Sequence, residues 1–565
     1  MVTASNDPKA SSGPRPSDAA TPEKATRRDG AWLPSRFLRA GAAVGAALLV
    51  FKFAGLLQSI AVGRYLPKAA GDIYVFAFEN CVFALFLLGD GIIGPALMPV
   101  FMREASSGPD GERRAWKNAS AFLTWQFLVL AVLVALLATF PAFFVSLLTS
   151  WTPESNPDKF ALAASTVRRL APSLLGLSLG STTYTLLNAR KRFFTAALGD
   201  AAWKFTAIVA LLLFAHGSAD PARVLISGLV AGSVAKLALH FAGLGRDAMR
   251  LRPTLRFEGG FPRAFAVLAW PLAMGVVFAL VRDNLNNVYF PSLLTDGMMQ
   301  ANSWGSKLEK VLVVLIPTTL SIAAFPFMCE MAAEKGAIGS FASSISRQML
   351  ALFMPLAAFV AVAALPITAL VFQGGAFDHA SVHRTALSMS LYTLALPAVA
   401  VETILMKAFF ASRRTLPVAL LGMAFSTLSV VLSWLGSRHF ADREMLVLAS
   451  IAGGFVLSRW LKTTALCAIF RRSERSFGGW PFALFVAKLA VASVVAALAA
   501  REVLMLVPAI SPLASKGAIL VRLVEAGCAA AAALVISFAV LRIREPLELL
   551  RLVRSGRKAK KTRGE

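Results

Sequence analysis

The hydrophobic positions of this chain fall in long runs separated by short polar segments. Most runs hold about 20 or more predominantly apolar residues, the length at which an α-helix crosses the hydrocarbon core of a bilayer. The pattern predicts an all-α polytopic membrane protein with about fourteen transmembrane helices and, because that number is even, both termini on one side. The predicted spans are 37–63, 72–102, 119–148, 161–188, 193–215, 222–245, 262–293, 299–332, 341–371, 384–411, 416–437, 445–470, 481–507 and 517–541.

Composition agrees with this pattern. The 565 residues are 57% hydrophobic and 16% charged, as expected for a polytopic membrane protein rather than a soluble domain. The net charge of +26 raises the alternative of nucleic-acid binding, but the basic residues form short clusters between apolar segments. That distribution favours the positive-inside rule and contacts with anionic membrane lipids, and no nucleic-acid partner is expected.

The loops divide into a basic set and a poorer set, which predicts the orientation. The basic set holds clusters near 103–117, 190–192, 246–263, 413–414 and 471–475, together with the C-terminal tail. By the positive-inside rule these loops and both termini are cytoplasmic. Residues 1–30 are expected to form a disordered cytoplasmic tail, and residues 542–565 a basic cytoplasmic tail.

A weak internal echo suggests two halves. The fourth predicted helix contains Pro172 and the tenth contains Pro397, and each ends in a small residue followed by a basic cluster. Duplication, as in many transporters, and chance similarity between apolar helices both remain open. With duplication, residues 31–250 form an N-lobe with six spans and residues 251–470 a C-lobe with six. Residues 471–541 then supply two additional helices.

Charged residues inside the predicted spans are the main functional signal, because they are costly at membrane depth and normally face a cavity or an ion pair. The second span carries Glu79 and Asp90, followed by Pro95 and Pro99. We expect its second half to be bent or locally unwound along a transport cavity. The other polar residues that we place at depth are Lys52, Gln58, Arg282, Asp283, Lys307, Glu309, Lys310 and Glu402.

The cations of this set suit a phosphate or pyrophosphate group, and neighbouring carboxylates can pair with them when the cavity is empty. A purely structural ion pair is the alternative at each position. The chain contains no Walker loop, HExxH or G-x-S-x-G motif, so a membrane enzyme is the weaker class. No cofactor and no metal site are predicted.

Several short motifs together resemble the MurJ/MviN lipid II flippases, members of the MOP exporter superfamily. The first is the run from Lys52 to Arg64, KFAGLLQSIAVGR, and the second is GDIYVFAF at 71–78. Further matches are the Gly89-Asp-Gly91 segment and ALMPVF at 96–101, LNARKRF at 187–193, FQGGAF at 372–377 and FASRRTLP at 410–417. Their order spans roughly the first three quarters of the chain.

The resemblance implies a flippase that moves undecaprenyl-pyrophosphate-linked peptidoglycan precursor across the bacterial inner membrane by alternating access. It implies that residues 471–541 form a groove for the lipid tail. Family cations correspond to Lys52 and Lys307, with Arg282 near a third and Lys310 beside Lys307, so these four are the expected pyrophosphate cradle. Residues expected to shape or gate the cavity are Gln58, Asp72, Glu79, Asp90, Asp283, Glu309 and Glu402. Na+, H+ or the membrane potential would bias the equilibrium between the inward-open and outward-open states.

Two departures from the family pattern leave the identity of the substrate undecided. Gln58 and Leu85 stand where the family places arginines, and Arg-to-Lys changes remove bidentate phosphate recognition. A flippase for another polyprenyl-linked oligosaccharide, a degenerate paralogue, and a drug or cation antiporter of the same superfamily are alternatives. A non-transporting scaffold that recruits the cell-wall synthesis machinery through its tails is another.

Overall fold

A computed structural model describes residues 53–313, 337–412, 414–506 and 515–543, with single positions 324, 328 and 331. Lys52, the predicted tail 1–30 and residues 544–565 lie outside the described residues. The regular secondary structure of the described part is helical, apart from one isolated bridge between Gly374 and Phe377.

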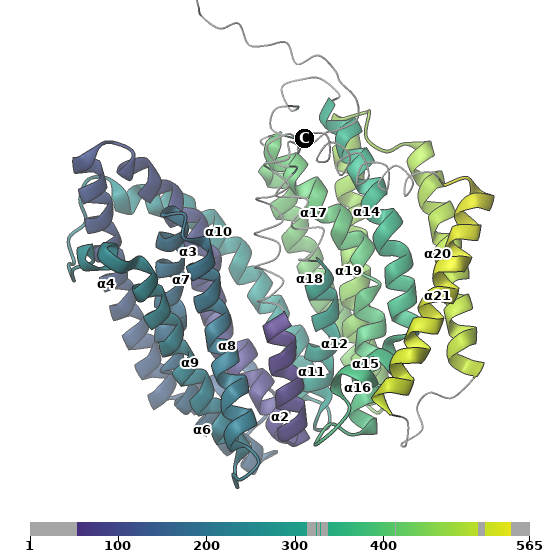
Figure 1. Cartoon of the computed structure of the whole chain (residues 1–565), viewed down its shortest axis with the longest axis horizontal. Helices are drawn as coiled ribbons and strands as arrows, with labels where there is room; N and C mark the ends of the chain where they lie inside the picture. The colour runs from purple at the N-terminus through teal and green to yellow at the C-terminus, as the bar shows by residue number, and fades with distance from the viewer. Residues whose placement is uncertain are drawn as a thin grey trace, which may run out of the picture.

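The helices gather into two bundles, which Figure 1 shows side by side. The first bundle is defined here as α2 (Lys68–Tyr74), the π-helix η1 (Val75–Val82), α3 (Phe83–Ala105), α4 (Pro109–Thr139), α5 (Pro141–Leu148), α6 (Pro157–Leu170), α7 (Ser173–Ala189), α8 (Phe193–Phe214) and α9 (Pro221–Leu244). The short 3₁₀-helix η2 (Gly245–Arg250) and an extended segment then lead to α10 (Phe261–Asn284), which packs against α3 of this bundle and α18 of the other.

The second bundle follows α10 and the π-helix η3 (Leu285–Tyr289). It comprises α11 (Phe290–Ser292), α12 (Met298–Val313), α14 (Ala337–Val362), α15 (Ala364–Phe372), α16 (His379–Thr393), α17 (Leu396–Ala411), α18 (Thr415–His439), α19 (Glu444–Ser473), α20 (Trp480–Leu506) and α21 (Lys516–Leu541). Helices α20 and α21 pair with each other and attach mainly through α14. They form the outer edge of this bundle in Figure 1.

The fold class predicted from the sequence is confirmed: the protein is an all-α, multi-pass membrane protein. Among the described residues, ten helices are long and apolar enough to cross a membrane, and the pair α16 and α17, bent by 42°, makes an eleventh. Of the remaining predicted spans, 37–63 and 299–332 extend outside the described residues. The span 161–188 is divided at Ala171 and Pro172 between α6 and α7.

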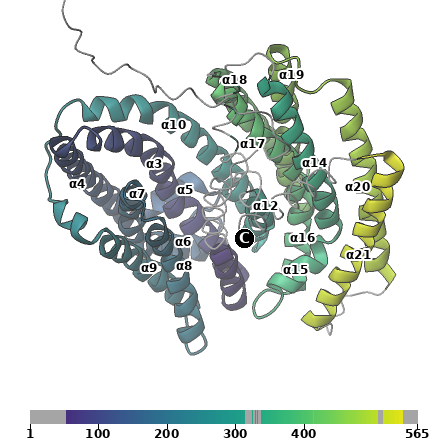
Figure 2. The same cartoon turned by 45° about the horizontal axis from the view of Figure 1, so that its top comes forward.

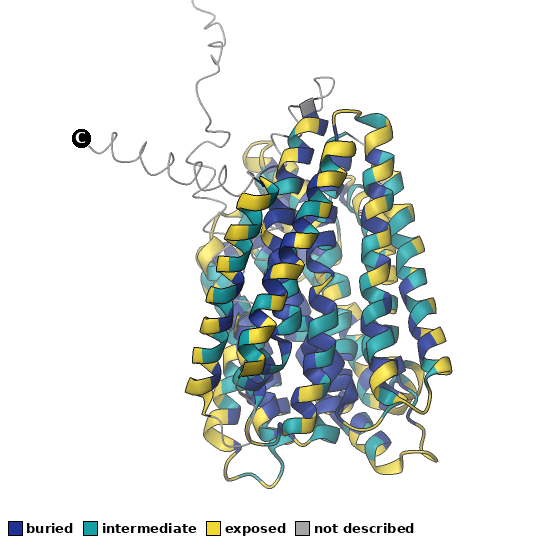
Figure 3. Cartoon of the chain, turned by 90° about the vertical axis from the view of Figure 1, so that its right-hand side faces the viewer, coloured by how far each residue is buried: buried dark blue, intermediate teal, exposed yellow. Residues whose placement is uncertain are grey.

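Large apolar side chains on the outer helix faces are exposed, as a bilayer requires. Leu213 on α8 is 68% exposed and Val535 on α21 is 67% exposed. Figure 3 shows exposed stripes along the outer helices and buried positions between them. So much exposed apolar surface would be a liability in water, whereas here it faces lipid.

The second half of the second span, which was expected to be bent or locally unwound, is curved but not unwound (Figure 2). Helix α3 is α-helical from Phe83 to Ala105 through both Pro95 and Pro99. It packs against α7 and α10, and such neighbours let a membrane helix tolerate proline. Figure 2 shows α3 as an arch. The irregular stretch is instead η1, in the first half of the span, and it contains Glu79.

The two bundles converge at one end, called here the closed end, where α2, α11 and α16 lie, and they separate toward the other (Figure 1). One hydrophobic cluster crosses between the bundles and includes Val62, Val75, Trp304, Phe372 and Phe377. The opposite, open end carries the basic loops of the first bundle. In Figure 1 the helices of the two bundles therefore lie further apart at the basic end.

Candidate functional site

An ion pair joins the two bundles. Lys307 Nζ on α12 lies 2.6 Å from Glu79 Oε1 on η1 and donates to Ser59 Oγ at 2.5 Å. Ser303 donates to the other Glu79 oxygen at 2.8 Å. The Lys307 and Glu79 side chains are 20% and 17% exposed, so the pair is neither fully buried nor free in solvent. π-Helical segments such as η1 often occur at functional sites.

Asp72 has a different role: it caps a helix of the other bundle. Its carboxylate accepts the backbone N–H groups of Gly297 and Gln300, at 2.8 and 2.9 Å, at the start of α12. A carboxylate at a helix N-terminus satisfies orphan donors and interacts favourably with the helix dipole. Lys159 lies 3.5 Å from Asp72 and 2.5 Å from Asp296. Asp72 is therefore a link between the bundles at the closed end.

Weaker contacts surround this link. Lys68 pairs with Asp378 at 2.7 Å, with side chains 32% and 51% exposed, and Ala376 N–H donates to the Arg64 carbonyl at 3.1 Å. Burial alone would raise the pKa of Asp378, but hydrogen bonds from Lys68 and Ser381 outweigh it and lower that pKa to about 2. This carboxylate is therefore ionised at neutral pH.

Gln58, on the helix that precedes α2, and Asp90 on α3 lie in separate contacts. Gln58 donates to the Tyr74 hydroxyl at 3.0 Å. Asp90 accepts from Ser181 at 2.8 Å and is near a pair that the sequence reading did not single out, Lys236 and Asp200, 2.7 Å apart.

Near the end of α10, Arg282 Nη2 lies 2.7 Å from its neighbour Asp283. Glu402 is buried between two further cations, Lys462 at 2.7 Å and Arg459 at 3.1 Å. Glu309 is buried within electrostatic range of Lys310, Arg459 and Glu402, and Lys310 itself is exposed. Glu402 thus sits in a buried ion cluster. The contacts of the described residues do not draw Arg282, Lys307 and Lys310 into one cradle.

The sequence reading missed Lys236, Arg459 and Lys462. Each is a basic residue inside a predicted span, 222–245 or 445–470, and that position alone could have marked it. Their carboxylate partners lie 36 to 60 residues away, so the pairing itself needed the packing of α8 against α9 and of α17 against α19.

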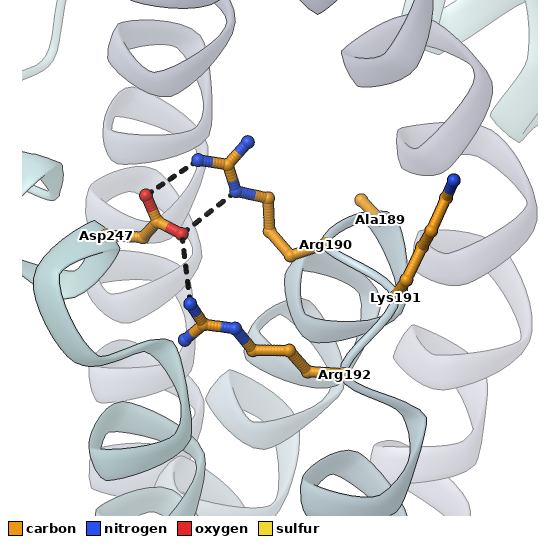
Figure 4. A pocket seen from close by; sticks show the side chains of 5 residues that line it. All are labelled: Ala189, Arg190, Lys191, Arg192 and Asp247. Atoms are coloured by element: carbon orange, nitrogen blue, oxygen red, sulfur yellow. Dashed lines mark hydrogen bonds and ion pairs between the residues drawn. The ribbon is translucent and has the colours of Figure 1, made fainter.

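The basic end of the first bundle holds a pocket of about 370 Å³ lined by Ala189, Arg190, Lys191, Arg192 and Asp247. Figure 4 shows both arginines turned toward Asp247. Arg190 donates to both Asp247 oxygens, at 2.9 and 2.8 Å, and lies 3.2 Å from Glu112. The hydrogen bonds to Asp247 raise the pKa of Arg190 above its usual range. The positive charge of Arg190 is therefore compensated by carboxylates of the same chain.

Lys52 lies outside the described residues. In the part of the chain that the structure describes, no group of three or more His, Cys, Asp or Glu side chains could hold a metal ion.

Comparison with known proteins gives a consistent result. The family model described as "Lipid II flippase MurJ" matches residues 67–524. A "Probable lipid II flippase MurJ" of Bdellovibrio bacteriovorus is 27% identical over 398 residues, which cover 68% of this chain and 72% of that protein. One from Rhizobium meliloti is 24% identical and covers 76% of this chain and 79% of its own length.

Solved structures share the fold. "Lipid II flippase MurJ, inward closed conformation" superposes with a TM-score of 0.70 at 16% identity, covering 88% of this chain and 98% of that one. An inward-facing multidrug resistance MATE family transporter of the MOP superfamily gives 0.62 at 10% identity, over 75% and 95% of the two chains.

Proposed function

Because the chain belongs to the MurJ lipid II flippase family, we propose that it translocates lipid II, the undecaprenyl-pyrophosphate-linked peptidoglycan precursor. The movement is outward across the bacterial cytoplasmic membrane, by alternating access, with both termini in the cytoplasm. The bundles, closed at one end and apart at the basic end (Figure 1), fit the inward-open state of such a cycle if the basic loops are cytoplasmic.

The observation that carries the proposal is the pair of Lys307 with Glu79. A lysine that is 20% exposed where the bundles meet, and held by a carboxylate 2.6 Å away, can exchange that carboxylate for another anion. A pyrophosphate offers the same charge-assisted hydrogen bonds. In this proposal Lys52, Arg282 and Lys310 complete the cradle as the bundles move.

The remaining residues fall into three roles. Asp72 holds the closed end together, and Gln58, Glu79 and Asp90 shape the first-bundle wall. Asp283, Glu309 and Glu402 keep the second-bundle cations near neutrality. Na+, H+ or the membrane potential would then bias the equilibrium between the inward-open and outward-open states.

Complementation of a strain depleted of its lipid II flippase tests the proposal. We expect the wild-type chain to restore growth and the double variant Lys52→Ala/Lys307→Ala to fail at equal membrane abundance. The matched control is Lys52→Arg/Lys307→Arg, which keeps both charges and should retain rescue. Full rescue by the double alanine variant would refute the cradle.

Two alternatives give different results. A flippase for another polyprenyl-linked oligosaccharide, such as an O-antigen or exopolysaccharide precursor, would leave the strain unrescued but restore export of that polymer. It is favoured only by Gln58 and Leu85, which replace family arginines. A scaffold for cell-wall enzymes would lose function when residues 1–28 and 551–565 are deleted, whereas a flippase should lose little.

A further inference from the structure

A second cavity lies in the first bundle, away from the Lys307 site. It has a volume of about 370 Å³ between α3, α4 and the start of α10. Its lining is almost wholly apolar and includes Leu85, Ile93, Phe122, Val129, Phe261 and Phe265. We call this cavity the α3/α4/α10 groove.

The groove faces outward. Val129 on its wall is 62% exposed and Trp125 is 46% exposed, and both lie on α4, a helix long enough to span the membrane. The one long polar side chain in the lining is occupied: Gln126 donates to the Ser178 carbonyl and accepts from Thr182. What remains toward the bilayer is an apolar slot.

An extended segment, 251–260, closes the groove at the basic end. Its backbone is tied to α4: Trp125 Nε1 donates to the Leu255 carbonyl at 3.1 Å, and Glu258 N–H donates to Asn118 Oδ1 at 2.8 Å. This segment contributes Phe257 to the lining, and the first turn of α10 contributes Pro262. These hydrogen bonds therefore hold the end of the groove in place, next to the basic loops of the first bundle.

Two arginines stand beside these lining residues. Arg256 precedes Phe257 and Arg263 follows Pro262, and both are exposed. Within the described residues, neither guanidinium group has an ion pair or a hydrogen bond. Arg190 differs, since Asp247 and Glu112 already compensate its charge. Two exposed arginines without a side-chain partner among the described residues thus adjoin, in the sequence, residues that line the basic end of the groove.

We propose that the α3/α4/α10 groove binds an anionic phospholipid, with an acyl chain in the slot and the phosphate at Arg256 and Arg263. Basic pockets between membrane helices are known to hold anionic headgroups, and the slot supplies the matching site for the chain. The lipid would brace α10 against α3 and α4 at the point where α10 leaves the first bundle. This site is separate from the substrate cradle.

Native mass spectrometry of the detergent-purified full chain tests this, with phosphatidylglycerol and phosphatidylcholine titrated separately. Arg256→Ala/Arg263→Ala should weaken phosphatidylglycerol binding about 25-fold, because each arginine near a lipid headgroup contributes about a fivefold effect. Phosphatidylcholine binding should not change. The control Arg471→Ala/Arg472→Ala removes the same charge from exposed positions of the second bundle and should behave as wild type.

A groove-filling variant tests the slot itself. A Cβ added at Gly89 would lie 3.6 Å from Ile93 Cδ1, an ordinary contact, so Gly89→Leu should fold and exclude both lipids. Equal phosphatidylglycerol affinity in Arg256→Ala/Arg263→Ala and its control would overturn the proposal. So would displacement of phosphatidylglycerol by an equimolar polyprenyl phosphate, which would assign the groove to a polyprenyl tail.

Discussion

Asp72 offers the sharpest test of how the two bundles are held together. Its side chain is 3% exposed and accepts two backbone N–H groups of the other bundle. Replacing Asp72 with Ala removes both hydrogen bonds and leaves the first turn of α12 without its cap. We expect the closed end to separate more often.

The magnitude follows from these two bonds. A hydrogen bond to an ionised group contributes about 1.5–3 kcal/mol, so losing two weakens the closed end by about 3 kcal/mol even at the low end of that range. That corresponds to roughly a 100-fold shift in the ratio of closed to separated molecules. Asp72→Asn keeps one acceptor but loses the charge, and it should fall between Ala and wild type.

Distances between spin labels measure the shift. Labels at Ser155 and Asp442, both exposed, would report on the two bundles near the closed end, in a background without native cysteines. Asp220→Ala is the matched control, because Asp220 caps α9 inside the first bundle by accepting from Arg223 N–H. An unchanged distance distribution in Asp72→Ala, or an equal change in Asp220→Ala, would refute the reasoning.

Two further predictions concern the same end. The pKa of Asp378 is lowered from 3.8 to about 2, so its pairing with Lys68 stabilises the folded state above about pH 4 and is lost as the pH falls toward 2. The difference in thermal unfolding between wild type and Asp378→Asn should shrink over that range, and a constant difference would contradict it. Gly375 has φ +62°, and a Cβ there would clash with the Arg64 carbonyl oxygen, so Gly375→Ala should destabilise the protein by about 1–3 kcal/mol or more. Gly259→Ala is the control, because Gly259 has φ +64° but open space around it. The difference in thermal stability between the two variants therefore measures the clash, and equal losses would show that the clash contributes nothing.

Hydrophobic runs predicted the fold class because each membrane helix satisfies its own backbone hydrogen bonds, so that run length alone identifies it. The same logic could not locate the π-helix η1. Pro95 and Pro99 were visible in the sequence, yet α3 continues through them, because tolerance of proline depends on neighbouring helices. The π-helix around Glu79 contains no proline or glycine that would have marked it in the sequence.

Individual charges at depth were recognisable, but their partners were not. Glu79 and Lys307 are 228 residues apart, and only the approach of the bundles brings them together. Asp72 was expected to shape or gate the cavity, and its hydrogen bonds to the start of α12 could not be read from its own helix. The lobe boundaries and the cradle stay predictions, and Lys52 lies outside the described residues.

The contacts between the bundles determine how far a bound substrate can shift the equilibrium between the closed and the separated arrangement. Moving a two-state equilibrium from 1:99 to 99:1 requires about 5.5 kcal/mol of differential affinity. If a pyrophosphate displaces Glu79 from Lys307, the lost coupling between the two bundles is about 0.5–3 kcal/mol, which is too little alone. The cap at Asp72 adds about 3 kcal/mol to the closed end, so exchange at Lys307 can open the protein only if that cap is also weakened. Asp72→Ala should therefore make the closed end sensitive to a diphosphate ligand that has little effect on the wild-type distance distribution.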